Sequence, residues 1–234
     1  MAQIMETLQY GSTEISYSVV YSKRKTLGIV VNPDGTVIIK APIDTPFTKI
    51  EEKVRKRASW IVKQQSFFKS FGNHIPPRRY ISGESHLYLG RQYRLYVREG
   101  KPNNVSFKGR CLEIVCGAKS KAESLMKDWY RERAKMKFTE IAEPIFQQFR
   151  KYNVEPKSLY IQVMENRWGS CTPKGKIILN TELIKAPKPC IEYVITHEMC
   201  HLMHKNHTKA FYEILHTEMP DWEKWKNKLE KFMY

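Results

Sequence analysis

The segment His197-Glu198-Met199-Cys200-His201 places two histidines four positions apart, with a glutamate directly after the first. On an α-helix, residues four apart lie on one face, so both imidazoles can reach one metal ion while the glutamate lies beside it. A bound Zn²⁺ lowers the pKa of its water toward neutrality, and a carboxylate can then remove the proton as the water attacks a carbonyl or phosphorus. The segment therefore predicts a metal-dependent hydrolase with His197 and His201 as ligands and Glu198 as general base.

A third histidine, His207, follows His201 by six positions. A catalytic zinc takes three protein ligands and keeps one position open, so His207 completes the set, with one ion per chain. Three imidazoles suit Zn²⁺, but nickel, cobalt or manganese would also fit these donors.

His204 distinguishes this chain from one known group of peptidases. The HExxH-x5-H spacing is that of the metzincins, which have a glycine where this chain has His204. A gluzincin-like site would instead take its third ligand from a later glutamate, Glu213 or Glu218. His204 itself is interpreted as a residue of the helix end, as a second-shell donor, or as a fourth ligand. The last alternative would make the metal structural.

The elements that position these residues follow from apolar spacing. Ile191, Val194, Ile195 and Leu202 form an apolar stripe that anchors the helix carrying the histidines. Upstream, the pattern predicts a helix over 120–152, which a proline at 144 could kink or split. A strand at 158–164 and a hairpin turning at 172–175 follow, and everything after 189 is expected to be helical, with breaks near 204 and 220.

The N-terminal part is expected to be rich in strands. A hairpin turning at 32–35 precedes a helix from 47 to 72 with a basic outer face, and three or four more strands follow before 118. The fold class is therefore α+β. The predicted domains are a β-rich domain with a basic helix over 1–118 and a zincin-like domain with a small sheet and the HExxH helix over 119–234. No internal repeat is evident.

The composition of the chain limits which binding partners and which cellular compartment we expect. Lys and Arg outnumber Asp and Glu by 40 to 24, which gives a net charge of +16, and residues 46–80 carry nine basic and two acidic side chains. This charge is equally compatible with a solvated lysine-rich surface and with a basic face that binds nucleic acid, a nucleotide or an acidic protein. Five scattered cysteines without a CxxC pair, no evident signal peptide and no membrane-length apolar segment predict a cytoplasmic protein that does not bind membranes. The oligomeric state does not follow from the sequence.

The segment "RWGSC" at 167–171 contains the other candidate site residues. Arg167 could stabilise an oxyanion or bind phosphate, or simply pair with a carboxylate, and Trp168 could stack on a substrate ring or belong to the core. The backbone of this hairpin could hold an extended substrate by strand addition. Asn180 and Tyr193 flank the region, and Tyr193, four positions before His197, is a candidate second-shell residue.

Four stretches together resemble a known family: "RWGSC", "IILNTELIKAP", "IEYVITHEMCHLMHKNHTKAFYEIL" and "PDWEKWKNKLE". They are similar to the YgjP-like metal-dependent hydrolases, which are related to the SprT-like zincin peptidases. The similarity extends upstream through "ISGESHLYLGRQYRL" and "APIDTP". The resemblance implies a compact zincin domain in which His197, His201 and His207 bind the metal and Glu198 is the base.

Three functions remain open from the sequence. The first is a cytoplasmic zinc metallopeptidase that acts on peptide or protein. The second is a nucleoside triphosphate (pyrophospho)hydrolase that uses the same site, which the net charge of +16 and Arg167 favour. The third is a nucleic-acid-associated binding module with a structural metal, which would need a fourth ligand such as His204.

Overall fold

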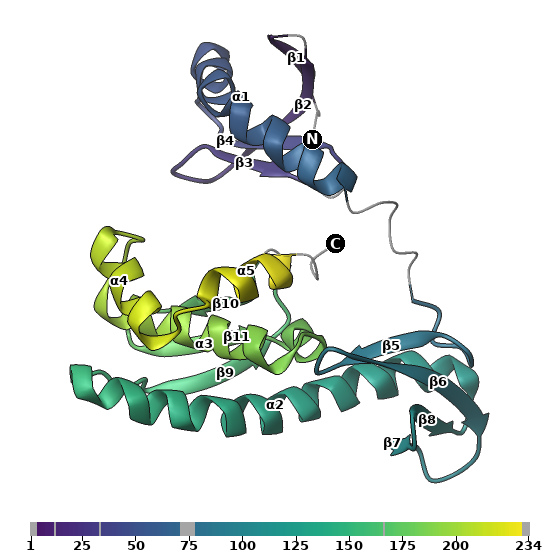
Figure 1. Cartoon of the computed structure of the whole chain (residues 1–234). Helices are drawn as coiled ribbons and strands as arrows, with labels where there is room; N and C mark the ends of the chain where they lie inside the picture. The colour runs from purple at the N-terminus through teal and green to yellow at the C-terminus, as the bar shows by residue number, and fades with distance from the viewer. Residues whose placement is uncertain (1–3, 12, 33, 71–77, 166, 231–234) are drawn as a thin grey trace. The chain divides into compact units, whose positions relative to one another are not determined.

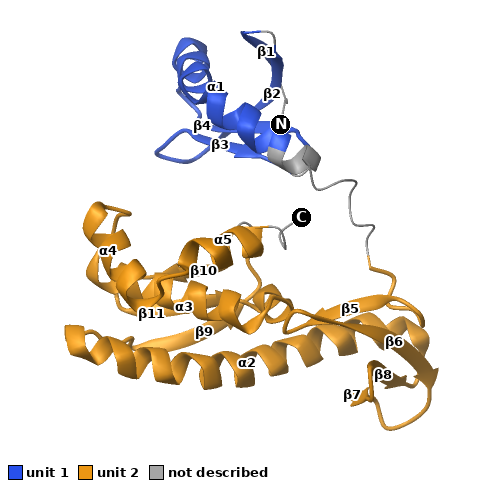
Figure 2. Ribbon diagram, viewed as in Figure 1, with its two compact units in different colours: residues 1–76, 234 blue, residues 77–233 orange. Residues whose placement is uncertain are grey.

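The computed structural model describes residues 4–11, 13–32, 34–70, 78–165 and 167–230. For residues 4 and 67–70 it describes the backbone and not the side chains. The chain divides into two compact units, residues 1–76 and 77–233 (Figure 2). Both contain sheets and helices, which confirms the predicted α+β class.

Unit 1 is a four-stranded sheet followed by a helix. Its strands are β1 (Ile4–Tyr10), β2 (Thr13–Ser22), β3 (Gly28–Val31) and β4 (Val37–Pro42), in the order β1-β2-β4-β3, and α1 (Phe47–Ser70) lies across one face (Figure 1). The β3–β4 pair is the predicted hairpin, and Gly35 in its turn has a φ of +82°, which glycine adopts without strain. Pro33 and the predicted helix end at Gly72 lie outside the described residues.

Unit 2 begins with the same arrangement. Strands β5 (Ser85–Tyr88), β6 (Arg91–Glu99), β7 (Asn104–Lys108) and β8 (Cys111–Cys116) pair in the order β5-β6-β8-β7 and lead through η1 (Lys119–Lys121) into α2 (Ala122–Phe149). In both units the central pair, β2–β4 or β6–β8, is parallel and the two outer pairs are antiparallel. The structure therefore contains an internal ββββα repeat, which the sequence did not reveal.

The predicted domain boundary near 118 does not coincide with the division between the units, which falls at 76/77. The physical reason is a shared core: Leu95, Leu112 and Ile114 of the second sheet pack in one cluster with Met126 and Phe138 of α2. The change from strands to a long helix at 118 is thus internal to unit 2.

The rest of unit 2 surrounds α3 (Lys188–Met203). After η2 (Arg150–Tyr152), strands β9 (Ser158–Gln162), β10 (Gly169–Cys171) and β11 (Lys176–Asn180) form a sheet in the order β10-β11-β9, and η3 (Thr181–Lys185) leads to α3. Helices α4 (Lys209–Glu218) and α5 (Trp222–Glu230) follow. One predicted break lies between α3 and α4, and the other lies between α4 and α5. α2 runs unbroken past Pro144, so the predicted split does not occur.

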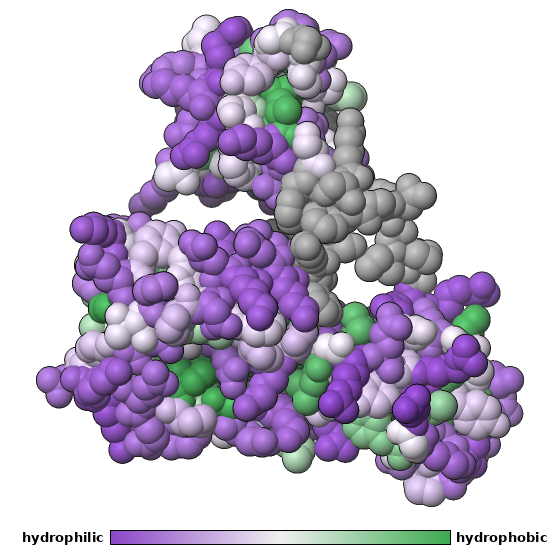
Figure 3. Space-filling view, in the orientation of Figure 1, coloured by the Kyte–Doolittle hydropathy of each residue, from purple (hydrophilic) through white to green (hydrophobic). Residues whose placement is uncertain are grey.

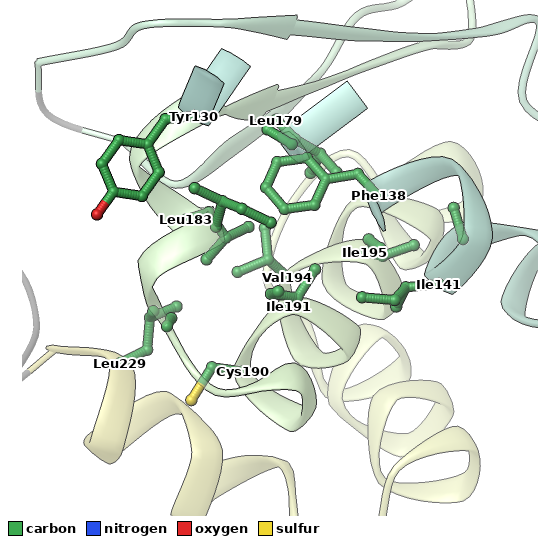
Figure 4. Close-up of a cluster of buried hydrophobic side chains, with 14 of the residues drawn as sticks. Tyr130, Phe138, Ile141, Leu179, Leu183, Cys190, Ile191, Val194, Ile195 and Leu229 are labelled. Atoms are coloured by element: carbon green, nitrogen blue, oxygen red, sulfur yellow. The ribbon is translucent and has the colours of Figure 1, made fainter. Parts of the chain in front are cut away.

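The core of unit 2 fixes α3 between α2 and the small sheet. Ile191, Val194 and Ile195 of α3 meet Phe138 of α2 and Leu179 of β11 in one buried cluster (Figure 4). This packing holds one side of α3 in place, and it therefore also determines the position of the opposite side of the helix.

The face drawn in Figure 3 is mostly hydrophilic on both units. Among the described helices, none combines the length and the apolar character that a membrane span requires.

Candidate metal centre

The HExxH segment occupies the second half of α3. This helix begins with a proline in its first turn, where the missing N–H costs no hydrogen bond, and it ends at Met203. His197 and His201 therefore lie one helical turn apart on the same face. His207 comes from the short connection between α3 and α4, outside either helix.

The three histidines converge on one point. The Nε2 atom of His197 lies 3.2 Å from Nε2 of His201 and 3.0 Å from Nε2 of His207. Three nitrogens bound to one tetrahedral zinc at about 2.0–2.1 Å would be about 3.3 Å apart, so the observed spacing fits one ion. Within the described part of the chain, this trio is the group of His, Cys, Asp and Glu side chains whose geometry could hold a metal.

The hydrogen bonding and burial of the histidines also fit a metal. Nδ1 of His201 lies 3.1 Å from the carbonyl oxygen of His204, so Nδ1–H must donate and Nε2 keeps its lone pair for an ion. Burial, followed by the nearby charges of His201 and His207, lowers the pKa of His197 to about 3. Partial desolvation also lowers the pKa of His207, although this residue is the most exposed of the three. These shifts favour neutral imidazole, which is the form that binds metals.

One buried side chain contacts all three histidines. The ring of Phe211, on α4, is fully buried, and its centroid lies 5.0 Å from that of His197, 4.8 Å from His201 and 4.7 Å from His207. Phe211 thus forms an apolar floor under the candidate site. We did not identify it from the sequence, although its position four residues after His207, at the start of an amphipathic helix, was an available signal.

A stack of aromatic rings extends from the third histidine. The ring of His207 stacks on Tyr212 at 6.1 Å, Tyr212 stacks on Trp222 at 5.5 Å, and Trp222 stacks on Tyr193 at 6.3 Å. Tyr193 in turn lies 5.8 Å from the ring of His197. Through these ring contacts, the connection that carries His207 packs against α4 and α5, and α5 packs against α3.

Glu198 is buried beside the histidines. Its residue is 6% exposed, and this burial raises the pKa of its carboxyl to about 7, although the charge of Arg167 opposes the rise. Strand β10 passes directly over it: a Cβ added to Gly169 would lie 2.7 Å from Oε1 of Glu198 and 2.8 Å from Cγ1 of Val194. Only glycine lets β10 approach α3 this closely, and no motif in the sequence marks Gly169 as a functional residue.

The candidate centre opens into a cleft of about 830 Å³. Its walls come from Arg167 and from residues within 153–157, 169–175 and 197–207. Four cationic side chains line it, Lys157, Arg167, Lys174 and Lys205, and none of them has an ion-pair partner among the described residues. The cleft lining also contains Glu155 and Glu198, so its positive side chains outnumber its negative ones.

The remaining sequence candidates lie around the cleft in different ways. Trp168 is half-buried against the core, and Asn180 is buried, with its Nδ2 donating to the carbonyl oxygens of Met164 at 2.7 Å and Arg167 at 2.8 Å. Tyr193 packs beside His197, and His204 contributes its carbonyl oxygen to His201. Of the five, Arg167 alone is among the described residues that line the cleft.

The two glutamates considered as an alternative third ligand are engaged by other side chains. Nζ of Lys209 lies 3.5 Å from the carboxylate of Glu213, which is largely exposed. The carboxylate of Glu218 is engaged by Nζ of Lys151 at 2.9 Å and by Nε2 of Gln148 at 2.7 Å. Neither glutamate belongs to the described group that could hold a metal.

Comparison with known proteins gives one family. The family model described as "YgjP-like, metallopeptidase domain" matches residues 25–232, and no curated protein was found to match the chain. The match includes α3, the β10–β11 hairpin and all three histidines of the candidate centre. The chain therefore belongs to the YgjP-like family of metallopeptidase-domain proteins.

Proposed function

We propose that this chain is a zinc-dependent peptidase in which His197, His201 and His207 hold the ion and Glu198 is the general base. The observation that carries the proposal is the convergence of three Nε2 atoms, at 3.0 and 3.2 Å, next to a buried carboxylate at the floor of a cleft. Membership of a metallopeptidase-domain family supports the same chemistry.

The chain's own residues have distinct roles in this proposal. When bound, the ion supplies a Lewis acid that polarises the substrate carbonyl and activates a water molecule. Glu198 accepts a proton from the attacking water and returns it to the leaving amine. Arg167, at the rim, stabilises the negative charge that develops on the carbonyl oxygen.

The edge of the small sheet can hold an extended peptide. β10 is the outermost strand in the order β10-β11-β9, and Gly169, Ser170 and Cys171 all line the cleft. A peptide that pairs with the free edge of β10 would gain main-chain hydrogen bonds and pass close to Glu198.

A second candidate is hydrolysis of a nucleoside triphosphate on the same site. The four unpaired cations of the cleft, Lys157, Arg167, Lys174 and Lys205, favour it because they could bind a phosphate chain. A carboxylate-rich peptide would use the same cations, so their presence alone does not choose between the two substrates.

A structural metal is less well supported than a catalytic one. Such sites usually have four protein ligands, whereas the described group contains three histidines and excludes His204. A base-like glutamate beside the ion would also have no role there. The cytoplasmic location stays a prediction.

The test is turnover by the zinc-loaded chain on two panels, unfolded casein with mixed peptides and the nucleoside triphosphates, compared with the Glu198→Gln variant. We expect peptide cleavage, read by mass spectrometry, that the variant reduces at least about 100-fold while it still binds one zinc. Phosphate or pyrophosphate release that depends on Glu198, without peptide cleavage, would replace the peptidase with the second candidate. Zinc binding without turnover on either panel would contradict both.

A further inference from the structure

The internal repeat allows the two helices to be compared directly. α2 buries ten residues, because it packs on its own sheet and also on α3 and η3. Among the described side chains of α1, four are buried, Ile50, Val54, Ala58 and Ile61, and α1 packs on strands of its own sheet. Within unit 1, the outer side of α1 is therefore not covered by any described element.

This uncovered side carries a regular stripe of side chains. Lys49, Lys53, Lys56, Trp60 and Lys63 recur every three or four residues and are all exposed; we call them the α1 stripe. Residues at this spacing share one helical face, and the stripe is about 21 Å long at 1.5 Å per residue.

Most of the charge on the stripe is not neutralised. Lys56 pairs with Glu52 at 3.0 Å, but both side chains are largely exposed, so this pair contributes little. Lys49, Lys53 and Lys63 have no ion-pair partner among the described residues. A row of unpaired ammonium groups favours a partner with regularly spaced negative charges.

The exposed Trp60 indicates which class of anionic partner the α1 stripe could bind. It is 41% exposed, whereas the other four tryptophans of the chain are buried or half-buried. An indole amid lysines offers a flat stacking surface beside phosphate-binding groups, and unpaired nucleic-acid bases offer matching rings. In duplex nucleic acid the faces of the bases are covered by stacking, and an acidic protein does not offer one ring beside each negative charge.

We propose that the α1 stripe of unit 1 is a docking surface for single-stranded nucleic acid, with Lys49, Lys53 and Lys63 on phosphates and Trp60 stacked on a base. This surface belongs to unit 1 and does not depend on the hydrolytic chemistry proposed for unit 2. The residues that line the cleft of unit 2 do not include those of the stripe, so we expect variants of the stripe to hydrolyse substrate at the rate of the unsubstituted chain.

The test is fluorescence anisotropy with the full-length, zinc-loaded chain and a labelled 20-nucleotide single strand, DNA and RNA in turn, over a salt series. Duplex DNA of the same sequence and poly-glutamate serve as competitors. We expect Trp60→Ala to weaken single-strand binding about 5- to 100-fold without changing the salt dependence, and Trp60→Phe to restore most of the affinity. Lys53→Ala with Lys63→Ala should lower the slope of log K against log salt by about 1.4, because each lost phosphate contact on a single strand contributes about 0.7.

A matched control removes the same charge elsewhere. Lys119 and Lys121 are exposed in unit 2, so Lys119→Ala with Lys121→Ala should leave affinity and salt dependence unchanged. Thermal unfolding checks that every variant is folded. Equal loss of binding in the control pair, or no effect of Trp60→Ala, would overturn the proposal. Poly-glutamate or duplex DNA that competes as well as the single strand would also overturn it, in favour of a general acidic or duplex partner.

Discussion

At the scale of residues, Glu198 is positioned by contacts from two directions. Its position in the HExxH segment of α3 places it beside His197 and His201. On its other side, β10 approaches so closely at Gly169 that no side chain would fit there. The HExxH spacing was sufficient to predict the first contact from the sequence. The second could not be predicted, because it depends on how closely a strand far from Glu198 in sequence approaches the helix.

The approach of β10 to α3 gives the first prediction. In Gly169→Ala, the added methyl group would lie within 2.9 Å of Glu198 and Val194, so either β10 or the carboxylate must move. We expect the turnover number to fall on the order of 100-fold, because a displacement of about 1 Å is enough for such a loss. Zinc affinity should change little, since the atoms nearest to the added methyl group belong to Glu198 and Val194 and not to the histidines.

The control for this prediction is Gly117→Ala, where the nearest atom to an added Cβ lies 3.9 Å away. Steady-state kinetics and a zinc-chelator titration on both variants separate loss of base geometry from loss of metal. Full activity in Gly169→Ala would show that Glu198 does not need the contact.

The carboxylate of Glu218 is held by three side chains of unit 2. Burial alone would raise the pKa of its carboxyl, but hydrogen bonds from Tyr152, Lys151 and Gln148 outweigh that effect and hold the pKa below the ordinary value of 4.5. The ionised form therefore stabilises the folded chain above about pH 4.5, and this contribution is lost as the pH falls through the lowered pKa.

Accordingly, Glu218→Gln should lower the free energy of unfolding by about 1–3 kcal/mol near pH 7, with a smaller difference from the unsubstituted chain near pH 4. Urea unfolding of the metal-free protein at both pH values measures it. Glu213→Gln, at an exposed pair on the same helix, is the control and should change stability little. A lower zinc affinity in Glu218→Gln would instead indicate that Glu218 is a metal ligand.

At the scale of elements, the candidate centre depends on how α4 and α5 hold the connection that carries His207. Periodicity predicted α3, α4, α5 and the break between α3 and α4, because apolar spacing is a local property. The position of Phe211 was a local signal for a buried side chain, but its contact with all three histidines is tertiary. The stack through Tyr212 and Trp222 is likewise a set of tertiary contacts, which no local pattern encodes.

The aromatic stack gives a prediction about metal affinity. Tyr212→Ala removes the ring between His207 and Trp222, and the connection carrying the third histidine should become less ordered. We expect zinc to bind about 2- to 10-fold more weakly, the usual effect of one aromatic pair, and Tyr212→Phe to bind normally. Competition with a chromophoric chelator measures both variants, and equal affinity in Tyr212→Ala would assign the positioning of His207 to Phe211 alone.

At the scale of the whole molecule, the chain uses one ββββα arrangement twice. In unit 2 the helix of the repeat supports α3, and in unit 1 the corresponding helix leaves a basic face exposed. The repeat was not recognisable in the sequence because the two copies fill their cores with residues of different size, such as Val54 in α1 against Trp129 in α2. The change from strands to a helix at 118 lies inside the second copy of the repeat, between β8 and α2, so it is not a junction between the units.

The two units have separate hydrophobic cores, which predicts independent folding of unit 2. All residues that line the cleft, and the buried cluster beneath them, lie within 77–233. A chain shortened to residues 77–234 should therefore fold and bind zinc with the affinity of the full chain. Circular dichroism and zinc titration test this, and an unfolded or zinc-free product would mean that unit 1 is required for the metal centre.

If His197, His201 and His207 form one metal site, the zinc affinity of the chain must depend on each of them. The measurement is a chelator-competition titration of the full chain, His207→Ala and His216→Ala, the last being an exposed histidine on α4 outside the group. We predict one tightly bound zinc per chain in the unsubstituted protein and in His216→Ala, and affinity lower by more than about 100-fold in His207→Ala, since loss of a ligand exceeds the effect of losing its supports. Unchanged zinc affinity in His207→Ala would contradict the account.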